Sequence, residues 1–130
     1  LHLFTAAIGA PSAQAASEQS RLIGQVMGLL EKSFGEAFDA DSVNAARFAV
    51  HLRYFLVRAR TAVQIEDGTS SLVAEALRTS DPDAYRVARR IRDLLEIRLN
   101  TIVTDDETAY LALHIARLTS SLQQTTQSDA

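Results

Sequence analysis

Apolar residues recur every three to four positions along most of this sequence, and no run alternates apolar with polar residues long enough to predict a β-strand. Five glycines and two prolines in 130 residues are too few for the many turns of a β-sandwich or a barrel. A chain of this length is expected to form one domain, and 47% hydrophobic with 22% charged residues is typical of a folded protein. We therefore predict an all-α fold, a compact five-helix bundle.

Helix start and stop signals divide the sequence into five predicted helices. Asp81 followed by Pro82 is a strong start signal, and Gly35 is a stop signal. Residues 64–71 form the clearest internal loop, because they contain an Asp-Gly pair. The predicted helices span about 18–34, 41–61, 72–78, 82–99 and 104–122.

Both ends of the chain differ from this helical middle. Residues 11–18 predict a linker between residues 1–10 and the rest of the chain. We therefore divide the chain into residues 1–16, which include most of this linker, a domain at 17–122, and a polar, frayed tail at 123–130. The apolar start resembles a signal peptide, but it lacks an initiating Met and a basic segment, so a piece of a longer polypeptide explains it better. No stretch approaches about 18 apolar residues, so we expect no membrane insertion and a cytoplasmic setting.

The composition excludes several classes of site. The chain has no Cys, so disulfides, thiol nucleophiles and cysteine-ligated metals are impossible. A net charge of −3 disfavours nucleic-acid binding through bulk charge. Arginines of the fourth predicted helix alternate with acidic residues, which is typical of a solvated helix face. These arginines are Arg86, Arg89, Arg90 and Arg92.

The second predicted helix carries a histidine between two apolar rows. Its core face consists of Phe48, Leu52, Phe55, Leu56 and Ala59. A polar stripe of Arg47, His51 and Arg58 lies beside that face. The second apolar row, beyond the stripe, is Val43, Val50 and Val57. This pattern predicts a helix that packs against its own bundle on one side and against something else on the other.

The last predicted helix repeats this arrangement. Its core face is Leu111, Ile115, Leu118 and Leu122, and its second row is Ala109, Leu113 and Ala116. Glu107 and His114 flank the core face on the same rotational side as His51 does in the second helix. If the two helices are neighbours, these side chains and Arg58 converge on one site. We predict that the two histidine side chains lie within about 15 Å of each other.

Two interpretations of the histidines stay open at this point. A histidine at the edge of an apolar face is often a hydrogen-bonded boundary residue without a function. Two histidines beside an arginine and a glutamate also form a plausible site for charge chemistry. Metal binding by His51, His114 and Glu107 is a weaker hypothesis, because no helix carries His-x-x-x-His or Glu-x-x-His spacing.

The segments RFAVHLRYFLVR (47–58) and DETAYLALHI (106–115) together resemble a PTS regulation domain of bacterial antiterminators of the BglG type. The family pattern has His-Leu with Arg seven residues on, then an acidic pair, Tyr-Leu and His-Ile. Its matches here are His51, Arg58, Glu107, Tyr110 and His114. The resemblance covers about residues 17–122 and is strongest to the second of two tandem copies. Residues 1–6 then resemble the final helix of the first copy, with His2 as its histidine.

The resemblance implies a regulator, with no enzymatic activity, no cofactor and no metal. It implies that His51 and His114 accept phosphate from the phosphocarrier protein or a sugar-specific enzyme II of the sugar phosphotransferase system. Residues expected to support the phosphorylated site are Arg47, Arg58, Glu107 and Tyr110. Glu107 would hold a ring nitrogen, and an arginine would balance the added charge. The output would be RNA binding by a module outside this chain.

The second apolar rows of the two helices predict a symmetric homodimer that buries these rows near the histidines.

Three functions other than control of an RNA-binding module stay open. The chain could regulate a DNA-binding activator, act as a helical enzyme that uses His51, His114 and Glu107 for metal or acid–base chemistry, or serve only as a structural dimerisation module.

Overall fold

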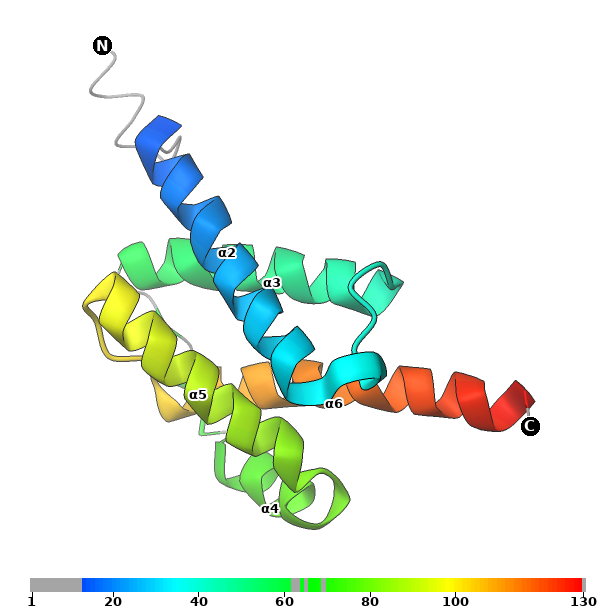
Figure 1. The fold of residues 1–130 in the computed structure, drawn as a ribbon. Coiled ribbons are helices and arrows are strands. Elements are labelled where there is room, and N and C mark those ends of the chain that lie inside the picture. The colour runs from blue at the N-terminus through cyan, green and yellow to red at the C-terminus, as the bar shows by residue number, and fades with distance from the viewer. Residues whose placement is uncertain (1–12, 62–63, 65, 69, 130) are drawn as a thin grey trace.

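The fold is a bundle of five α-helices, described in a computed structural model for residues 13–61, 64, 66–68 and 70–129 (Figure 1). The helices are α2 (Ala13–Phe34), α3 (Val43–Arg60), α4 (Ser70–Ser80), α5 (Pro82–Leu99) and α6 (Asp105–Asp129), and a 3₁₀ turn, η1 (Gly35–Ala37), follows α2. These ranges contain no β-strand. The all-α prediction is confirmed, and the predicted number of helices is correct.

The helix bounds differ from the predictions mainly at the two ends. Helix α2 begins at Ala13, so most of the predicted linker at 11–18 is helical. The reason is its alanines, which are the strongest helix formers. Helix α6 continues to Asp129, seven residues past its predicted end, because no Gly or Pro interrupts the polar residues there. Residues 1–12, which include His2, lie outside the described part of the chain.

The core lies where α6 packs against α3, α4 and α5, while α2 covers α3 and α5. Its large, almost fully buried side chains come from α2, α3, α5 and α6: Val26, Leu30, Phe48, Leu52, Phe55, Ile91, Leu95 and Ile115. Every core-face residue predicted for α3 is buried. In the described ranges, no helix is long and apolar enough to cross a membrane.

The predicted second apolar row of α6 is wrong. Ala109 is fully buried, as is Ala112, and Leu113 packs against the same core. The physical reason is that α6 contacts α3, α4 and α5, so a side of this helix that the sequence pattern leaves open is covered by neighbouring helices. The corresponding row of α3 does remain exposed, with 69% of Val43, 47% of Val50 and 48% of Val57 accessible to solvent.

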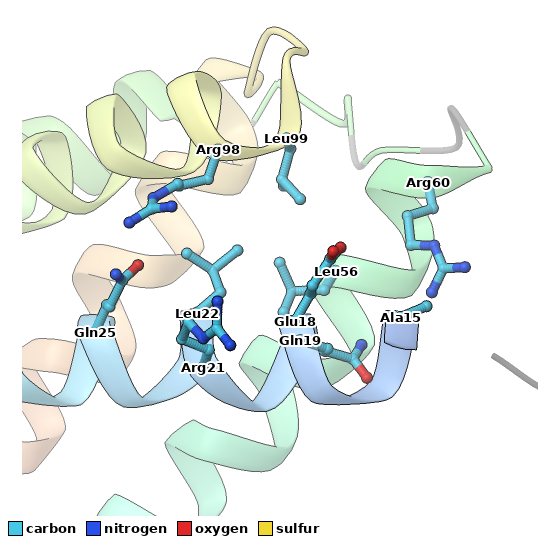
Figure 2. Close-up of a pocket in the computed structure, with 10 residues that line it drawn as sticks. All are labelled: Ala15, Glu18, Gln19, Arg21, Leu22, Gln25, Leu56, Arg60, Arg98 and Leu99. Atoms are coloured by element: carbon cyan, nitrogen blue, oxygen red, sulfur yellow. The ribbon is translucent and has the colours of Figure 1, made fainter. Parts of the chain in front are cut away.

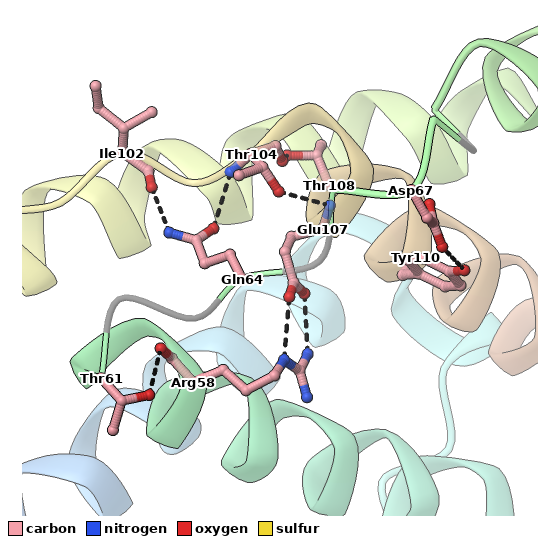
Figure 3. A network of polar contacts seen from close by, with 9 residues as sticks. All are labelled: Arg58, Thr61, Gln64, Asp67, Ile102, Thr104, Glu107, Thr108 and Tyr110. Atoms are coloured by element: carbon pink, nitrogen blue, oxygen red, sulfur yellow. Dashed lines mark hydrogen bonds and ion pairs between the residues drawn. The ribbon is translucent and has the colours of Figure 1, made fainter.

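Two polar side chains fasten the α3–α4 connection to the start of α6. The Asp106 carboxylate accepts hydrogen bonds from the backbone N–H groups of Gly68 (2.9 Å) and Ser70 (2.8 Å), and these bonds lower the pKa of Asp106. The Gln64 amide donates to the Ile102 carbonyl (2.6 Å) and accepts from the Thr104 N–H (3.0 Å) (Figure 3). These bonds hold the first turn of α6 next to the loop that follows α3.

Candidate functional site

Two histidine rings stack on each other at the contact between α3 and α6. The ring centroids of His51 and His114 are 4.3 Å apart, and the ring planes differ by 23°. The predicted adjacency of the two helices and of their histidines is therefore confirmed. His51 is exposed and His114 is partly buried, so the pair lies at the edge of the core with one ring open to solvent.

The rings line a cavity of about 250 Å³ together with three further predicted site residues. Arg58 contributes from α3, and Glu107 and Tyr110 contribute from α6. Phe48, Phe55 and Leu111 supply the apolar lining. Arg47 does not line this cavity; it is an exposed residue one helical turn before His51. Five of the six residues selected from sequence thus lie around one cavity.

Arg58 and Glu107 form a two-pronged ion pair at this cavity (Figure 3). Arg58 Nε donates to Oε1 of Glu107 (3.1 Å), and Arg58 Nη2 donates to Oε2 (3.0 Å). Glu107 is only 2% exposed, whereas the arginine side chain is 35% exposed. The sequence placed Glu107 beside the core face, and the structure buries it. The expected role of Glu107 as an acceptor for a histidine ring stays a prediction.

Tyr110 connects the cavity to the α3–α4 connection. Its hydroxyl donates to Oδ2 of Asp67, 2.8 Å away (Figure 3). Sequence reasoning did not assign Asp67 to the site, although it recognised the Asp-Gly turn that contains this residue. It also used Asp106 as part of the acidic pair of the family motif, but missed its bonds to the loop.

The position of His114 keeps its imidazole neutral. Burial, together with smaller contributions from the nearby His51 and Arg117, lowers the pKa of His114 from 6.5 to about 4. At neutral pH the ring therefore has a nitrogen lone pair available. A neutral imidazole beside a guanidinium can act as a nucleophile toward an electrophilic phosphorus or carbonyl centre.

This pKa predicts that His114 makes the folded protein less stable in acid. Below about pH 6.5 the unfolded chain binds a proton at His114 that the folded chain does not bind until about pH 4, so the free energy of unfolding falls as the pH falls through this window. Because the His114 side chain is only partly buried, we expect the free energy of unfolding to fall by about 1–2 kcal/mol between pH 7.5 and pH 5. Urea unfolding of the wild type and of His114→Gln at both pH values measures the difference. Parallel pH dependences of the two proteins would contradict this assignment.

The described part of the chain contains no group of three or more His, Asp or Glu side chains positioned to hold a metal ion. The metal hypothesis for His51, His114 and Glu107 thus has no ligand set there. Glu107 directs both carboxylate oxygens to Arg58, which is a structural role for this carboxylate.

Comparison with known protein families decides the classification. The family model of the PRD domain matches residues 24–118, which is most of the chain and includes all eight residues that line the histidine cavity. The chain belongs to the PRD domain family. The resemblance noted from the two histidine motifs is confirmed.

Three relatives of this PRD chain are named as antiterminators. The chain is 26% identical to the PtsGHI operon antiterminator of Bacillus subtilis (strain 168) over 94% of its own length and 42% of that protein. It is 28% identical to the beta-glucoside operon antiterminator of Dickeya chrysanthemi over 82% of its length and 38% of that protein. It is 23% identical to the transcription antiterminator LicT of Bacillus subtilis (strain 168) over 76% of its own length and 35% of that protein. The PRD chain thus spans well under half of each relative, and no solved structure matches it.

Proposed function

We propose that this PRD chain is a regulatory domain that is phosphorylated on His51, His114 or both by phosphohistidine proteins of the sugar phosphotransferase system. The donor would be the phosphocarrier protein or a sugar-specific enzyme II, which places the reaction in the cytoplasm. The observation that carries this proposal is the stacked histidine pair, with a neutral His114 ring, beside Arg58 in one cavity.

The residues of the cavity suit a phosphoryl transfer between imidazoles. A lone pair on an acceptor ring nitrogen attacks phosphorus, the new N–P bond forms, and the N–P bond to the donor histidine breaks. The donor ring leaves as neutral imidazole after taking up a proton, and the acceptor ring loses its N–H proton to solvent. The phosphohistidine then carries close to two negative charges, for which the partly exposed Arg58 guanidinium is a ready partner. Arg47, on the same face one turn earlier, can add a second positive charge.

The proposal is tested by incubating the chain with phosphoenolpyruvate, enzyme I and the phosphocarrier, and then mapping phosphohistidine by mass spectrometry at alkaline pH. We expect the label on peptides that contain His51 or His114. A repeat with a sugar-specific enzyme II as the last donor separates the two possible donors. A chain that takes no phosphoryl group from either donor would overturn the proposal.

We further propose that phosphorylation controls transcription antitermination through an RNA-binding module outside this chain. The names of the three relatives support RNA-level control over the alternative of a DNA-binding activator. Regulation would pass through a change in how domains or subunits pack when a dianion is added beside Arg58.

We expect the chain to form a homodimer through the exposed valine row of α3. Val43, Val50 and Val57 are each about half exposed or more, and Tyr54 nearby is 62% exposed, so the face has a reason to be covered. A two-fold axis through this face would place the histidine cavities near the rim of the interface.

Sedimentation at micromolar concentration tests this assembly. We expect a dimer for the wild type and a weakening of about tenfold or more for Val50→Asp, because a carboxylate would be buried without a partner. Leu72→Asp is the matched control, since Leu72 is an exposed apolar residue of α4 and lies outside the row. A wild type that stays monomeric, or equal behaviour of the two variants, would contradict the dimer.

A further inference from the structure

A second, larger cavity lies between α2, α3 and α5, away from the histidines. Its volume is about 510 Å³, within the range of small-molecule sites. None of its lining residues lines the histidine cavity. Figure 2 shows side chains of three helices surrounding this space, with Leu22 from α2, Leu56 from α3 and Leu99 from α5 at its centre. Leu22 and Leu56 belong to the buried core, so this part of the cavity is apolar.

Three arginines, one from each helix, line the same cavity. They are Arg21 on α2, Arg60 at the end of α3 and Arg98 near the end of α5. In the view of Figure 2, Arg60 and Arg98 lie on either side of Leu99. Glu18 is the one acidic side chain in the lining, so the cavity has a formal excess of two positive charges in a chain whose net charge is −3.

The three arginines of this cavity form no ion pair among the described residues, which is equally true of Arg47, Arg53, Arg89, Arg90 and Arg117. Arg58, Arg78, Arg86 and Arg92 each form an ion pair with a carboxylate of the chain. A position near a helix C-terminus explains a positive charge at Arg60 and Arg98, because a cation there offsets the helix dipole. That explanation does not apply to Arg21, which lies inside α2. It also does not explain why arginines of three helices line one cavity that has apolar side chains at its centre.

We propose that this cavity binds a small organic anion, with a phosphate or carboxylate group held by one of the two flanking arginines, Arg60 or Arg98, and an apolar body against Leu22, Leu56 and Leu99. A guanidinium fork matches the geometry of both kinds of oxyanion. The side-chain amides of Gln19 and Gln25 line the cavity as well and offer donors and acceptors to the polar edge of such a ligand. The carbonyl groups at the C-terminal ends of α3 and α5 carry partial negative charge and repel an anion. Binding therefore also requires the apolar contact between the body of the ligand and the three leucines.

The proposal is tested with phenyl phosphate as the probe and the full 130-residue chain, by NMR titration of backbone amide and arginine Nε–H resonances. We expect saturable one-to-one binding, with the largest shifts at Arg21, Arg60 and Arg98. Inorganic phosphate should bind at least about tenfold more weakly, because it lacks the apolar body. The double variant Arg60→Gln/Arg98→Gln should weaken binding of phenyl phosphate by about tenfold or more. Both arginines are exposed, and a thermal melt checks that the variant folds.

Arg90→Gln is the matched control, since Arg90 is an exposed arginine of α5 outside the cavity. The affinity of this variant for phenyl phosphate should equal that of the wild type. The proposal is overturned by no binding up to about 10 mM probe, by equal affinity for inorganic phosphate, or by a double variant that binds like the wild type. Shifts confined to Arg58 and the histidines would overturn it as well, because they would assign the probe to the other cavity. Phosphoryl transfer to the histidines is measured separately, so failure of one proposal leaves the other standing.

Discussion

Replacing both histidines, His51→Ala together with His114→Ala, is expected to abolish phosphoryl transfer to this chain. The two rings are the only imidazoles in the lining of the cavity, and the proposed acceptor of the phosphoryl group is an imidazole nitrogen. We expect labelling from the phosphocarrier to fall by at least about 100-fold in the double variant, as for loss of a covalent nucleophile. The two single variants then report which ring is the main acceptor.

This prediction requires that the double variant still folds. His51 is exposed and His114 only partly buried, so truncation removes the ring–ring contact and little core packing. The expected cost is about 1–2 kcal/mol, which circular dichroism melts can measure. The control is His2→Ala, which should leave the labelling of this chain unchanged. Full labelling of a folded double variant would show that the acceptor is another residue.

The histidine site could be predicted from sequence because it depends on two helices with regular geometry. A helical wheel gives the rotational offset of His51 and His114 from their core faces, and two antiparallel helices packed by those faces, as α3 and α6 are in Figure 1, bring equal offsets to the same side of the contact. The same reasoning placed Arg58 and Glu107 at the cavity. It could not rank Arg47 against Arg58, since both occupy the same stripe and only the position of α6 along α3 decides which one reaches the cavity.

The sequence pattern could not predict contacts made through loops, nor how many neighbouring helices cover α6. The bonds from Asp106 to Gly68 and Ser70, and from Tyr110 to Asp67, join residues 36–43 positions apart through an irregular segment. No periodicity encodes such a path. The wheel also shows which face of α6 is apolar but not how many helices cover it. For this reason Ala109 was expected at an outer surface and is instead fully buried.

Removing the arginine of the buried ion pair is expected to cost more stability than removing its glutamate. Arg58→Ala leaves the Glu107 carboxylate, 2% exposed, without its two charge-assisted hydrogen bonds, and we expect a loss of about 2–3 kcal/mol. Glu107→Gln keeps the shape of the side chain, and the 35% exposed Arg58 can turn to water, so its expected cost is about 1 kcal/mol. Urea unfolding measures both values. Arg86→Ala, which removes an exposed ion pair to Asp83, should change the free energy of unfolding by less than about 0.5 kcal/mol.

The double variant Arg58→Ala/Glu107→Gln decides between charge burial and simple loss of packing. If the cost of Arg58→Ala comes from the buried charge of Glu107, then removing that charge restores about 1–2 kcal/mol of the free energy of unfolding. The effects of the two single variants then do not add. Additive effects would mean that Arg58 stabilises the fold through its contact with the Phe55 ring, 6.0 Å from the guanidinium carbon, and not through Glu107.

Whether Arg58 acts through Glu107 or through packing also matters for regulation. A guanidinium held mainly by Glu107 can exchange that carboxylate for a phosphohistidine dianion in the same cavity, and each such exchange would remove the ion pair between Arg58 and the buried Glu107. Phosphorylation would then weaken the α3–α6 contact through loss of the same ion pair that Arg58→Ala removes, so the double variant should lose the effect of phosphorylation on stability.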